Sequence, residues 1–274
     1  QNLRSFVPVR EKHIFALMPA ADHDIGFFGA KLVSVFVDPA GQTHHAGYVM
    51  LFSEQTGQPV ALADAEEVSR IRTAAASAVA TDALARTDAG VLAILGTGKQ
   101  AEAHVRAIAC IRPLREIRIW GRHTDKAEAL AARLADTGLT VAAISTAKEA
   151  VSEADIVCTT TGAREPILKG AWLAPGTHIN IVGSSTPGPV EVDSDLVVNS
   201  RFIVDHKPHV LAHGAEFLKA KAEGRITDAH IVAEIGEVLA GMKQGRQGPE
   251  QITAYKSLGH AVHDIAASAL LCHD

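Results

Sequence analysis

The stretch Val91-Leu-Ala-Ile-Leu-Gly-Thr-Gly-Lys-Gln-Ala-Glu-Ala-His-Val-Arg-Ala-Ile108 decides the fold of this chain. Its first five residues are apolar and predict a buried strand, Gly96 and Gly98 predict a tight turn, and a helix is expected from about Lys99. The apolar face of that helix consists of Ala101, Val105 and Ile108. Such a turn directs backbone N–H groups and the positive end of the helix dipole toward one point, which suits the pyrophosphate of a dinucleotide. A plain tight turn is the alternative, because the third small residue of the full fingerprint is out of its usual register.

A second strand is expected at 116–120, and the residues after it bear on the choice of cofactor. Sites that prefer NAD(H) carry an acidic residue here, about 20 residues past the glycines, that bonds the ribose 2′-hydroxyl. In this chain Gly121 is followed by Arg122, with His123 and Thr124 beside it. A guanidinium can pair with a 2′-phosphate, which a carboxylate would repel. We therefore expect NADP(H) to be preferred and NAD(H) to remain possible; the alternative is an exposed charge without a ligand.

Composition and charge exclude several classes of protein. The 274 residues suffice for two modest domains, each with its own core. Charged residues make up 21% and hydrophobic residues 47% of the chain, which is ordinary for a globular enzyme. A net charge of −5 and an isoelectric point near 6.3 give no basic footprint for nucleic acid. The longest uncharged stretch, 170–190, is broken by glycines and prolines, so it predicts no membrane helix.

The cysteines indicate a reducing compartment. Cys110, Cys158 and Cys272 are odd in number, lack CxxC spacing and lie among apolar residues. They predict reduced core thiols in a cytoplasmic protein rather than disulfides or a metal centre. No signal peptide is visible, and because the chain begins at Gln1 without a Met, we expect that an N-terminal piece precedes it.

Fourteen histidines raise the question of a metal site. Three of them, in the run 206–213, have helical spacing, and His44 adjoins His45. No carboxylate completes a recognisable ligand set, and Pro208 disturbs the first turn of the expected helix. We therefore expect no metal.

The pattern of expected elements changes near residue 88. Before it, short strands predict an antiparallel meander, followed by an Ala-rich helix over 65–85. After it, strands and helices alternate, which predicts a doubly wound parallel sheet. The expected strands are 14–18, 31–37, 48–52, 59–63, 91–95, 116–120, 140–144, 155–161, 178–183 and 202–205, and further helices are 124–137, 148–153, 208–223, 228–242 and one from Gly259. The fold class is therefore α/β: a Rossmann domain over 88–257 and a smaller α+β domain over 1–87, to which 258–274 return.

Collinear segments along essentially the whole chain match one family. They are Gln1-Asn-Leu-Arg4, Met18-Pro-Ala20, Lys31-Leu-Val33, Arg72-Thr-Ala-Ala-Ala-Ser77, Gly96-Thr-Gly-Lys-Gln-Ala101, Ala154-Asp-Ile-Val-Cys-Thr-Thr-Thr161, Glu165-Pro-Ile-Leu168, Glu234-Ile-Gly-Glu237 and Ser257-Leu-Gly259. The chain resembles the ornithine cyclodeaminase/μ-crystallin family, and most closely its μ-crystallin-like ketimine reductases. The resemblance implies that the smaller domain binds substrate and forms a homodimer, and that the family carries a further N-terminal segment before the position of Gln1.

The resemblance also implies a substrate site. In the family an arginine, a lysine and a second arginine hold the substrate's α-carboxylate, and by motif match these are Arg4, Lys31 and Arg72. A planar guanidinium fixes a carboxylate in orientation as well as in charge. Without the family, Arg4 and Lys31 would be solvated charges, whereas Arg72 leads into an apolar run where an unpaired guanidinium is costly to bury. His45 is close to a family position near the substrate.

The cofactor contacts implied by the resemblance fall in the glycine turn and in three later segments. They are Gly96, Thr97, Gly98, Lys99, Gln100, Ala101, Gly121, Arg122, His123, Thr124, Thr160, Thr161, Ser257, Leu258 and Gly259.

Ser185 is the departure from the family pattern that matters most. Ornithine cyclodeaminases carry an aspartate at this position, which handles protons during deamination and ring closure. A carboxylate serves as a base near neutral pH, whereas a serine hydroxyl needs a partner base. Moving the match by one gives Ser184, and the nearby Glu191 and Asp193 are expected to be a helix cap and a first-turn charge. We take Lys31 and Ser185 as the catalytic candidates, since a hydroxyl can hydrogen-bond an imine nitrogen; a plain loop serine is the alternative.

These features predict an NAD(P)H-dependent oxidoreductase that reduces the C=N bond of a small cyclic imino acid of the pyrroline- or piperideine-2-carboxylate type. The alternatives within enzymes are ornithine cyclodeamination to proline and ammonia, and amino-acid dehydrogenation of the alanine type. An alternative of another class is a non-catalytic NADP-dependent ligand-binding protein. The expected partners are a small imino or amino acid and a second copy of the chain, without nucleic acid or membrane.

Overall fold

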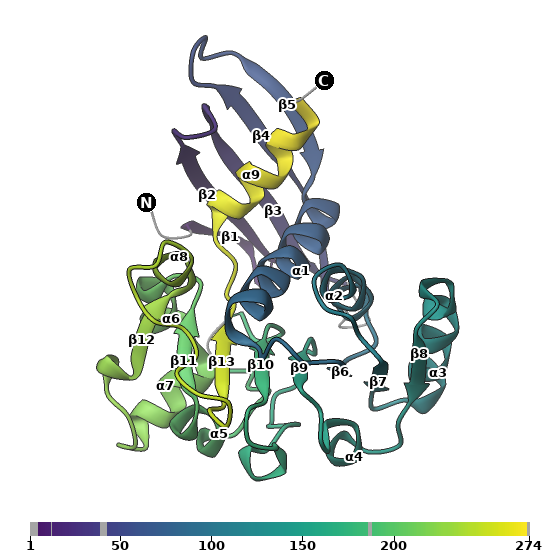
Figure 1. Ribbon diagram of the computed structural model, residues 1–274. Coiled ribbons are helices and arrows are strands. Elements are labelled where there is room, and N and C mark those ends of the chain that lie inside the picture. Colours follow the sequence, from purple (N-terminus) through teal and green to yellow (C-terminus); the bar gives the residue numbers. More distant parts are fainter. Residues whose placement is uncertain (1–4, 12, 39–42, 186–187, 273–274) are drawn as a thin grey trace. The chain divides into compact units, whose positions relative to one another are not determined.

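The computed structural model describes residues 5–11, 13–38, 43–185 and 188–272, and the chain forms two compact units (Figure 1). Unit 1 consists of residues 1–73 and 259–274, and unit 2 of residues 74–258. The boundary at residue 73 lies inside helix α1 (Ala65–Leu84), whereas the sequence placed it at residue 87, just past the end of that helix. No helix within the described ranges is long and apolar enough to cross a membrane.

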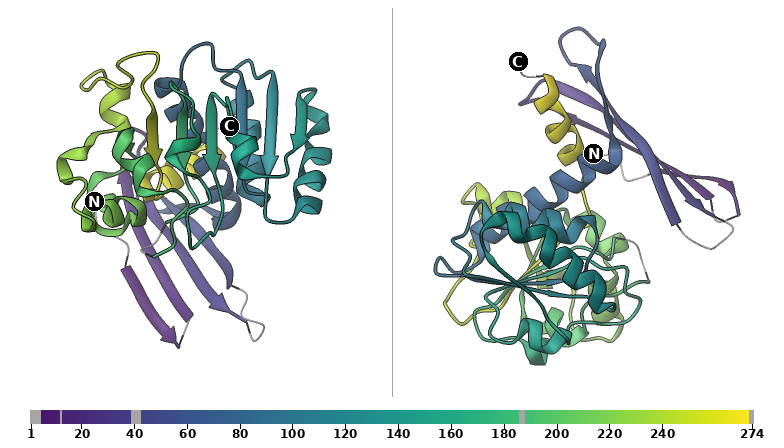
Figure 2. Two further views of the ribbon diagram at one scale, coloured as in Figure 1. Left: turned by 90° about the horizontal axis from the view of Figure 1, so that it is seen from below. Right: turned by 90° about the vertical axis from the view of Figure 1, so that its right-hand side faces the viewer.

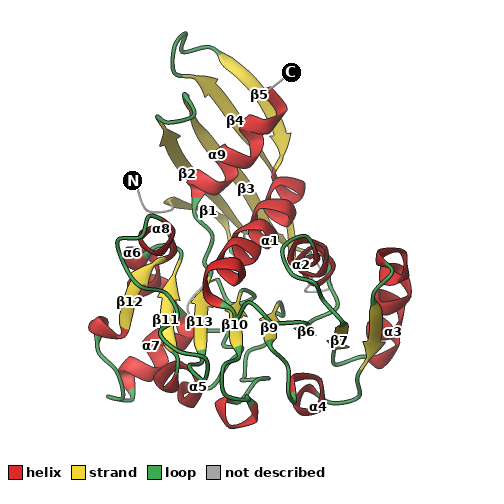
Figure 3. Ribbon diagram, in the orientation of Figure 1, coloured by secondary structure: helices red, strands yellow, loops and turns green. Residues whose placement is uncertain are grey.

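Unit 1 is a five-stranded antiparallel sheet with a helix against one face (Figure 3). Its strands lie in chain order: β1 (Ser5–Arg10), β2 (His13–Asp22), β3 (Phe27–Val37), β4 (Thr43–Ser53) and β5 (Pro59–Asp64). Helix α9 (Ala261–Ala269), followed by a 3₁₀ turn at Leu270–Cys272, packs on β2, β3 and β4, with Ile265 among buried Ala16, Val33 and Val49. The sequence predicted four of these strands. It missed β1 because Pro8 weakens a strand pattern, and proline is tolerated here because β1 is an edge strand.

Unit 2 is an eight-stranded parallel sheet in the order β12-β11-β13-β10-β9-β6-β7-β8. Its strands are β6 (Val91–Leu95), β7 (Glu116–Trp120), β8 (Thr140–Ala143), β9 (Ile156–Thr159), β10 (His178–Ile181), β11 (Arg201–Val204), β12 (Ile231–Glu234) and β13 (Thr253–Lys256). Its helices are α2 (Lys99–Ala109), α3 (Thr124–Arg133), α4 (Ala147–Val151), α5 (Ser194–Asn199), α6 (Lys207–His213), α7 (Ala215–Ala222) and α8 (Ile235–Leu239), with 3₁₀ turns at Leu134–Thr137, Gly170–Trp172 and Asp228–His230. This is the doubly wound architecture that the alternating pattern predicted.

Helices cover both faces of the parallel sheet, as the edge-on view shows (Figure 2, right). Leu92 and Ile94 of β6 pack against α1, α2 and α3 on one face. Ala93 and Leu95 face the other way, into a cluster with α4, α5 and α7. Because both faces are buried, the central strands read as continuous apolar runs rather than alternating ones, which is why 91–95 was recognisable from sequence.

Two of the predicted helices were wrong in part. The segment 208–223 holds two helices, since the backbone at Gly214 is extended and a Cβ there would lie 2.8 Å from the Val210 carbonyl oxygen. The segment 228–242 contains strand β12, whose burial alternates with a period of two, and only Ile235–Leu239 is an α-helix. The sequence also missed β13, which has four residues, while the short helix α5 follows Asp193, where a helix cap was expected. Cys110 is exposed and is not the core thiol that was expected, although Cys158 is buried and all three thiols are unpaired.

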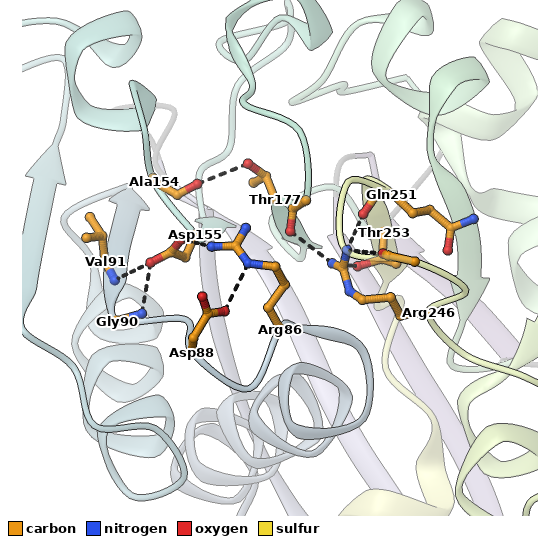
Figure 4. Close-up of polar contacts among 12 residues, drawn as sticks. Arg86, Asp88, Gly90, Val91, Ala154, Asp155, Thr177, Arg246, Gln251 and Thr253 are labelled. Carbon is orange, nitrogen blue, oxygen red and sulfur yellow. Dashed lines mark hydrogen bonds and ion pairs between the residues drawn. The ribbon is translucent and has the colours of Figure 1, made fainter.

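Two arginines hold the amino-terminal edge of the parallel sheet (Figure 4). Arg86 pairs with Asp155 at 2.5 Å, and the other oxygen of that carboxylate accepts the backbone N–H groups of Gly90 and Val91 at 2.9 and 3.0 Å. Arg246 donates to the carbonyl groups of Leu84, Gly176, Gly248 and Gln251 and to Thr253 Oγ1. Burial, and then the charge of Arg86, lower the pKa of Arg246 to about 10. These contacts tie the loops at the amino-terminal edge to the strands that begin there.

Candidate functional site

The glycine turn after β6 lies at the topological switch point of the sheet. Strand β6 is flanked by β7, which follows it in the chain, and by β9, which is the third strand after β6. In doubly wound sheets the connections diverge at such a point, and ligands bind outside the carboxyl ends of the strands there. The turn that the sequence singled out therefore occupies the position at which such sheets bind a dinucleotide.

The turn has the geometry that only glycine supplies. Gly96 has φ = +141°, its N–H donates to the Trp120 carbonyl at 2.8 Å, and a Cβ on it would lie 2.4 Å from Thr160 Oγ1. Gly98 is the N-cap of α2 and offers no side-chain cap, and a Cβ on it would meet nothing within 4 Å. The start of α2 is thus open at its N-cap, with its positive dipole end toward that space. These features fit the pyrophosphate of a dinucleotide cofactor.

The segment after β7 adjoins the glycine turn. A Cβ on Gly121 would lie 2.5 Å from Thr97 Cγ2, so the two strand ends approach closely. Arg122, His123 and Thr124 are exposed at the start of α3, and Asp125 follows them in its first turn. Among 121–124, the segment between β7 and Asp125, the one formal charge is that of Arg122.

The remaining expected cofactor residues follow the neighbouring strands. Thr160 comes directly after β9, and its N–H donates to the Leu95 carbonyl at 2.9 Å. After β13, the N–H of Ser257 donates to Ile181 at 3.0 Å, and that of Leu258 to Asp205 Oδ2 at 2.7 Å. Lys99, Gln100 and Ala101 form the first turn of α2, and Thr161 follows Thr160. Parallel strands present all these residues at one edge of the sheet.

Unit 1 contains a buried cluster of two cations and one carboxylate. Lys31 Nζ lies 3.3 Å and Arg72 Nε 3.0 Å from the same oxygen of Asp264, and the three side chains are 9%, 11% and 3% exposed. Lys31 also donates to Ser69 Oγ. Arg72 packs over Gly259, where φ is +80° and a Cβ would lie 2.7 Å from Nη1. Gly259, expected at the cofactor, is thus a unit 1 residue beside Arg72.

Lys31 and Arg72 share one oxygen of Asp264, so two cations converge on a single carboxylate atom. Arg72 Nη1 is buried, and within the described part of the chain it has no hydrogen-bond partner. A buried donor without an acceptor costs about 1–3 kcal/mol. This donor points to a group that can accept from it, and a carboxylate matches the guanidinium in shape.

Asp264 is a functional residue that the sequence interpretation missed. It lies on the buried face of α9 with Ile265 and Ser268. The signal was an acidic residue at an apolar position of an amphipathic helix, since acids in such positions are normally paired.

Of the other expected substrate residues, Arg4 lies outside the described residues. His45 is partly exposed and pairs with Val35 of β3, and Lys31 lies four residues from Val35, on the same face of the sheet. The pKa of His45 is lowered, first by partial burial and then by the charge of Lys31. His45 therefore lies on the same face of the unit 1 sheet as Lys31.

The structure distinguishes between the two candidate serines of unit 2. Ser184 is 1% exposed and donates to Glu216, whereas Ser185 is exposed. Asp193 caps α5 by accepting the Leu196 N–H at 2.9 Å, as expected. The prediction for Glu191 was wrong: it is fully buried and accepts four hydrogen bonds from loops at the carboxyl edge instead of serving as a helix-end charge.

Together, the switch point, the glycine turn and the strand order define unit 2 as a Rossmann-type dinucleotide-binding unit. The profile of the Ornithine cyclodeaminase/mu-crystallin family matches residues 1–274, and the chain belongs to this family.

Relatives of known activity cover nearly the whole chain. Ketimine reductase mu-crystallin of Mus musculus is 35% identical over 274 residues, which are 99% of this chain and 84% of the mouse protein. The structure of Thermococcus litoralis Delta(1)-pyrroline-2-carboxylate reductase in complex with NADH and L-proline has a TM-score of 0.92 and 32% identity, covering 99% of this chain and 87% of that one. An archaeal alanine dehydrogenase dimer with bound NAD has a TM-score of 0.90 and 31% identity, covering 99% and 85%.

Proposed function

We propose that this protein is an NAD(P)H-dependent reductase of the C=N bond in small cyclic imino acids, with pyrroline- or piperideine-2-carboxylate as the type substrate. The observation that carries the proposal is the buried Lys31–Arg72–Asp264 cluster, in which Nη1 of Arg72 has no hydrogen-bond partner among the described residues. A substrate carboxylate would accept a hydrogen bond from Nη1. The names of the mu-crystallin and pyrroline-2-carboxylate reductase relatives support this class of substrate.

The residues have separate roles in the proposed reaction. Lys31 and Arg72 bind and orient the carboxylate, with Arg4 as a further candidate and His45 beside them. A bound nicotinamide cofactor supplies hydride to the imine carbon. Ser185 hydrogen-bonds the imine nitrogen, which orients the C=N bond and favours its protonated form. Holding a substrate in one orientation supplies in advance the ordering that the reaction would otherwise require.

Ornithine cyclodeamination is the enzyme alternative, and the surroundings of Ser185 argue against it. Deamination needs a base that works near neutral pH. Glu191 is the carboxylate nearest in sequence, but it is fully buried and its oxygens already accept from Thr159, Thr161 and Gly183. It is therefore not accessible as the base.

We propose NADPH as the preferred cofactor, held by the glycine turn, with Arg122 on the 2′-phosphate. The relatives' structures contain NADH or NAD, so the general cofactor class has support from them, and the preference rests on Arg122. Three unpaired thiols suit a reducing, cytoplasmic location.

We also propose a homodimer formed through the face of the unit 1 sheet opposite α9. Even-numbered positions of β3 and β4 and their partners make that face, and its large apolar side chains are 37% to 58% exposed. They are Phe15, Phe28, Phe36, Tyr48 and Leu62. An apolar surface of this kind is typical of an interface.

The proposed activity is tested by a panel of substrates. We expect oxidation of NADPH with pyrroline-2-carboxylate and piperideine-2-carboxylate, little with pyruvate plus amine, and no ammonia from ornithine with NAD⁺. Robust conversion of ornithine to proline would show a cyclodeaminase instead. Tight binding of NADPH and imine without turnover would show a binding protein.

The carboxylate site is tested by Arg72→Ala. We expect kcat/KM for the ketimine to fall at least ~10²-fold, because orientation and charge pairing are lost together, while cofactor affinity stays unchanged. Arg70→Ala is the matched control on the same helix, since Arg70 pairs with Glu67 at the surface. If Arg72→Ala had the same kcat/KM as Arg70→Ala, Arg72 would not be part of the carboxylate site.

A further inference from the structure

Three charged side chains of unit 2 are completely buried at the carboxyl edge of the sheet. Glu191, Glu216 and Lys256 are at most 1% exposed. They come from the loop before α5, the first turn of α7 and the last position of β13. Burying an ion costs free energy, and buried ions can often be replaced by apolar residues without loss of stability. Stability alone therefore does not account for these three charges, and their contacts indicate which backbone they hold in place.

Lys256 and Glu216 fix Ser184. Lys256 Nζ donates to the carbonyl and to Oγ of Ser184, both at 2.6 Å, and lies 3.1 Å from Glu216 Oε2. Ser184 Oγ donates to Glu216 Oε1, which also accepts the Glu191 N–H at 3.1 Å. Both the side chain and the peptide carbonyl of Ser184 are therefore held by a buried ion pair.

Glu191 fixes Gly183, the residue before Ser184. One carboxylate oxygen accepts the Gly183 N–H at 2.7 Å and Thr159 Oγ1 at 2.8 Å, and the other accepts the N–H and Oγ1 of Thr161 at 2.6 and 2.8 Å. Burial raises the pKa of Glu191, while the charge of Lys256 and these bonds favour its ionised form. A Cβ on Gly183 would lie 2.0 Å from the Thr161 carbonyl oxygen, so the packing leaves room only for glycine.

We propose that Glu191, Glu216 and Lys256 are positioning residues for Ser185. They hold Gly183 and Ser184, the two residues that precede Ser185, and these contacts form a buried anchor. The exposed Ser185 follows this anchor directly in the chain. The inference rests on the proposed function, in which the Ser185 hydroxyl meets the imine nitrogen. A displacement of about 1 Å in such a group can cost ~10²-fold in rate, so a rigid support for the preceding backbone acts on turnover without touching substrate.

The kinetic test is a double-mutant cycle with Glu216→Gln and Ser185→Ala. We expect Glu216→Gln to lower kcat for the ketimine about 10²-fold and to change KM and the NADPH Kd less than about threefold. In the Ser185→Ala background, Glu216→Gln should lower kcat little further, because the effects of substitutions that act through one group are not additive. Glu223→Gln, the same substitution at an exposed position ending α7, is the control and should leave kcat unchanged. Full additivity, or a parallel loss of cofactor affinity, would overturn the proposal.

A second measurement does not depend on activity. Hydrogen exchange at the amides of residues 183–185 should be at least about tenfold faster in Glu216→Gln than in the parent, while the β6 amides stay unchanged. Unchanged exchange at 183–185 overturns the positioning role. The parent protein could also fail to reduce any imine while Glu216→Gln still speeds exchange at 183–185. That result supports the anchor and rejects the proposed function. Glu191→Gln gives the same readout if Glu216→Gln fails to fold.

Discussion

Arg122 is the residue on which the proposed preference for NADPH depends. It is exposed and follows Gly121, the first residue after β7, where a Cβ would lie 2.5 Å from Thr97 Cγ2 of the glycine turn. NADH and NADPH differ only by the 2′-phosphate, so a contact with that group changes one affinity and leaves the other nearly untouched. The preference between NADPH and NADH can therefore be tested without changing the rest of the cofactor site.

We expect Arg122→Asp to weaken NADPH binding 10- to 100-fold, or about 1.5–3 kcal/mol, because an attractive pair becomes a repulsive one. Affinity for NADH should change far less. Titration of both cofactors by fluorescence checks this, with Arg133→Asp at the far end of α3 as the control. Equal losses for the two cofactors would contradict a role in phosphate recognition.

Residues that the sequence interpretation missed or misread are mostly buried charges. Asp264, Glu216 and Lys256 were not singled out, and Glu191 was expected near the surface. Hydrophobic patterns place charged residues outside, and nothing in a local pattern tells which of them has a partner from a distant segment. By contrast, Gly96 was recognised because the positive φ that only glycine readily adopts is a local property of the turn.

A buried, neutral histidine of α2 forms a hydrogen bond with α1. His104 of α2 is fully buried. Its Nδ1 lies 2.7 Å from the Gln100 carbonyl, which can only accept, so Nε2 is the acceptor for Ser77 Oγ at 2.9 Å. Burial lowers the pKa of His104 to about 4, against a smaller opposing effect of the Gln100 bond.

This histidine should make unit 2 less stable in acid. The unfolded chain takes up a proton near pH 6.5 and the folded chain near pH 4, so the stability contributed by neutral His104 is complete above pH 6.5 and declines as the pH falls toward 4. At pH 5 the loss is about 2 kcal/mol. Urea unfolding at pH 7 and pH 5 should show this difference in the parent and in His123→Gln, which changes an exposed ring, but a smaller one in His104→Gln. The same pH dependence in all three would refute the assignment.

Elements with a strong local period were predictable, and those set by tertiary packing were not. Strand β6 and helix α2 carry their apolar pattern within one segment, so their bounds were nearly correct. Strand β13 ends in a lysine and has only four residues, and its place in the centre of the sheet gives no local signal. The break at Gly214 likewise depends on close contact with Val210.

At the scale of the whole molecule, the uncovered face of the unit 1 sheet predicts the assembly. Leu62→Glu should raise the dimer dissociation constant at least about 30-fold, because each copy would bring an unpaired charge into an apolar interface, at a cost of ~2 kcal/mol or more. Sedimentation over a range of concentrations measures this. Leu239→Glu on α8 is the control, because the two leucines are 58% and 57% exposed. A parent protein that is monomeric throughout would reject the interface.

The late position of β13 in the chain has a consequence for biosynthesis. This strand lies between β10 and β11, so the two halves of the parallel sheet cannot join until residues 253–256 have left the ribosome. Until then the nascent polypeptide exposes two unpaired strand edges, and such edges template pairing with other chains. Arg246, whose partners include Leu84, Gly176 and Thr253, emerges only shortly before. We therefore expect chaperone binding to nascent chains to persist through most of translation and to end when β13 is inserted.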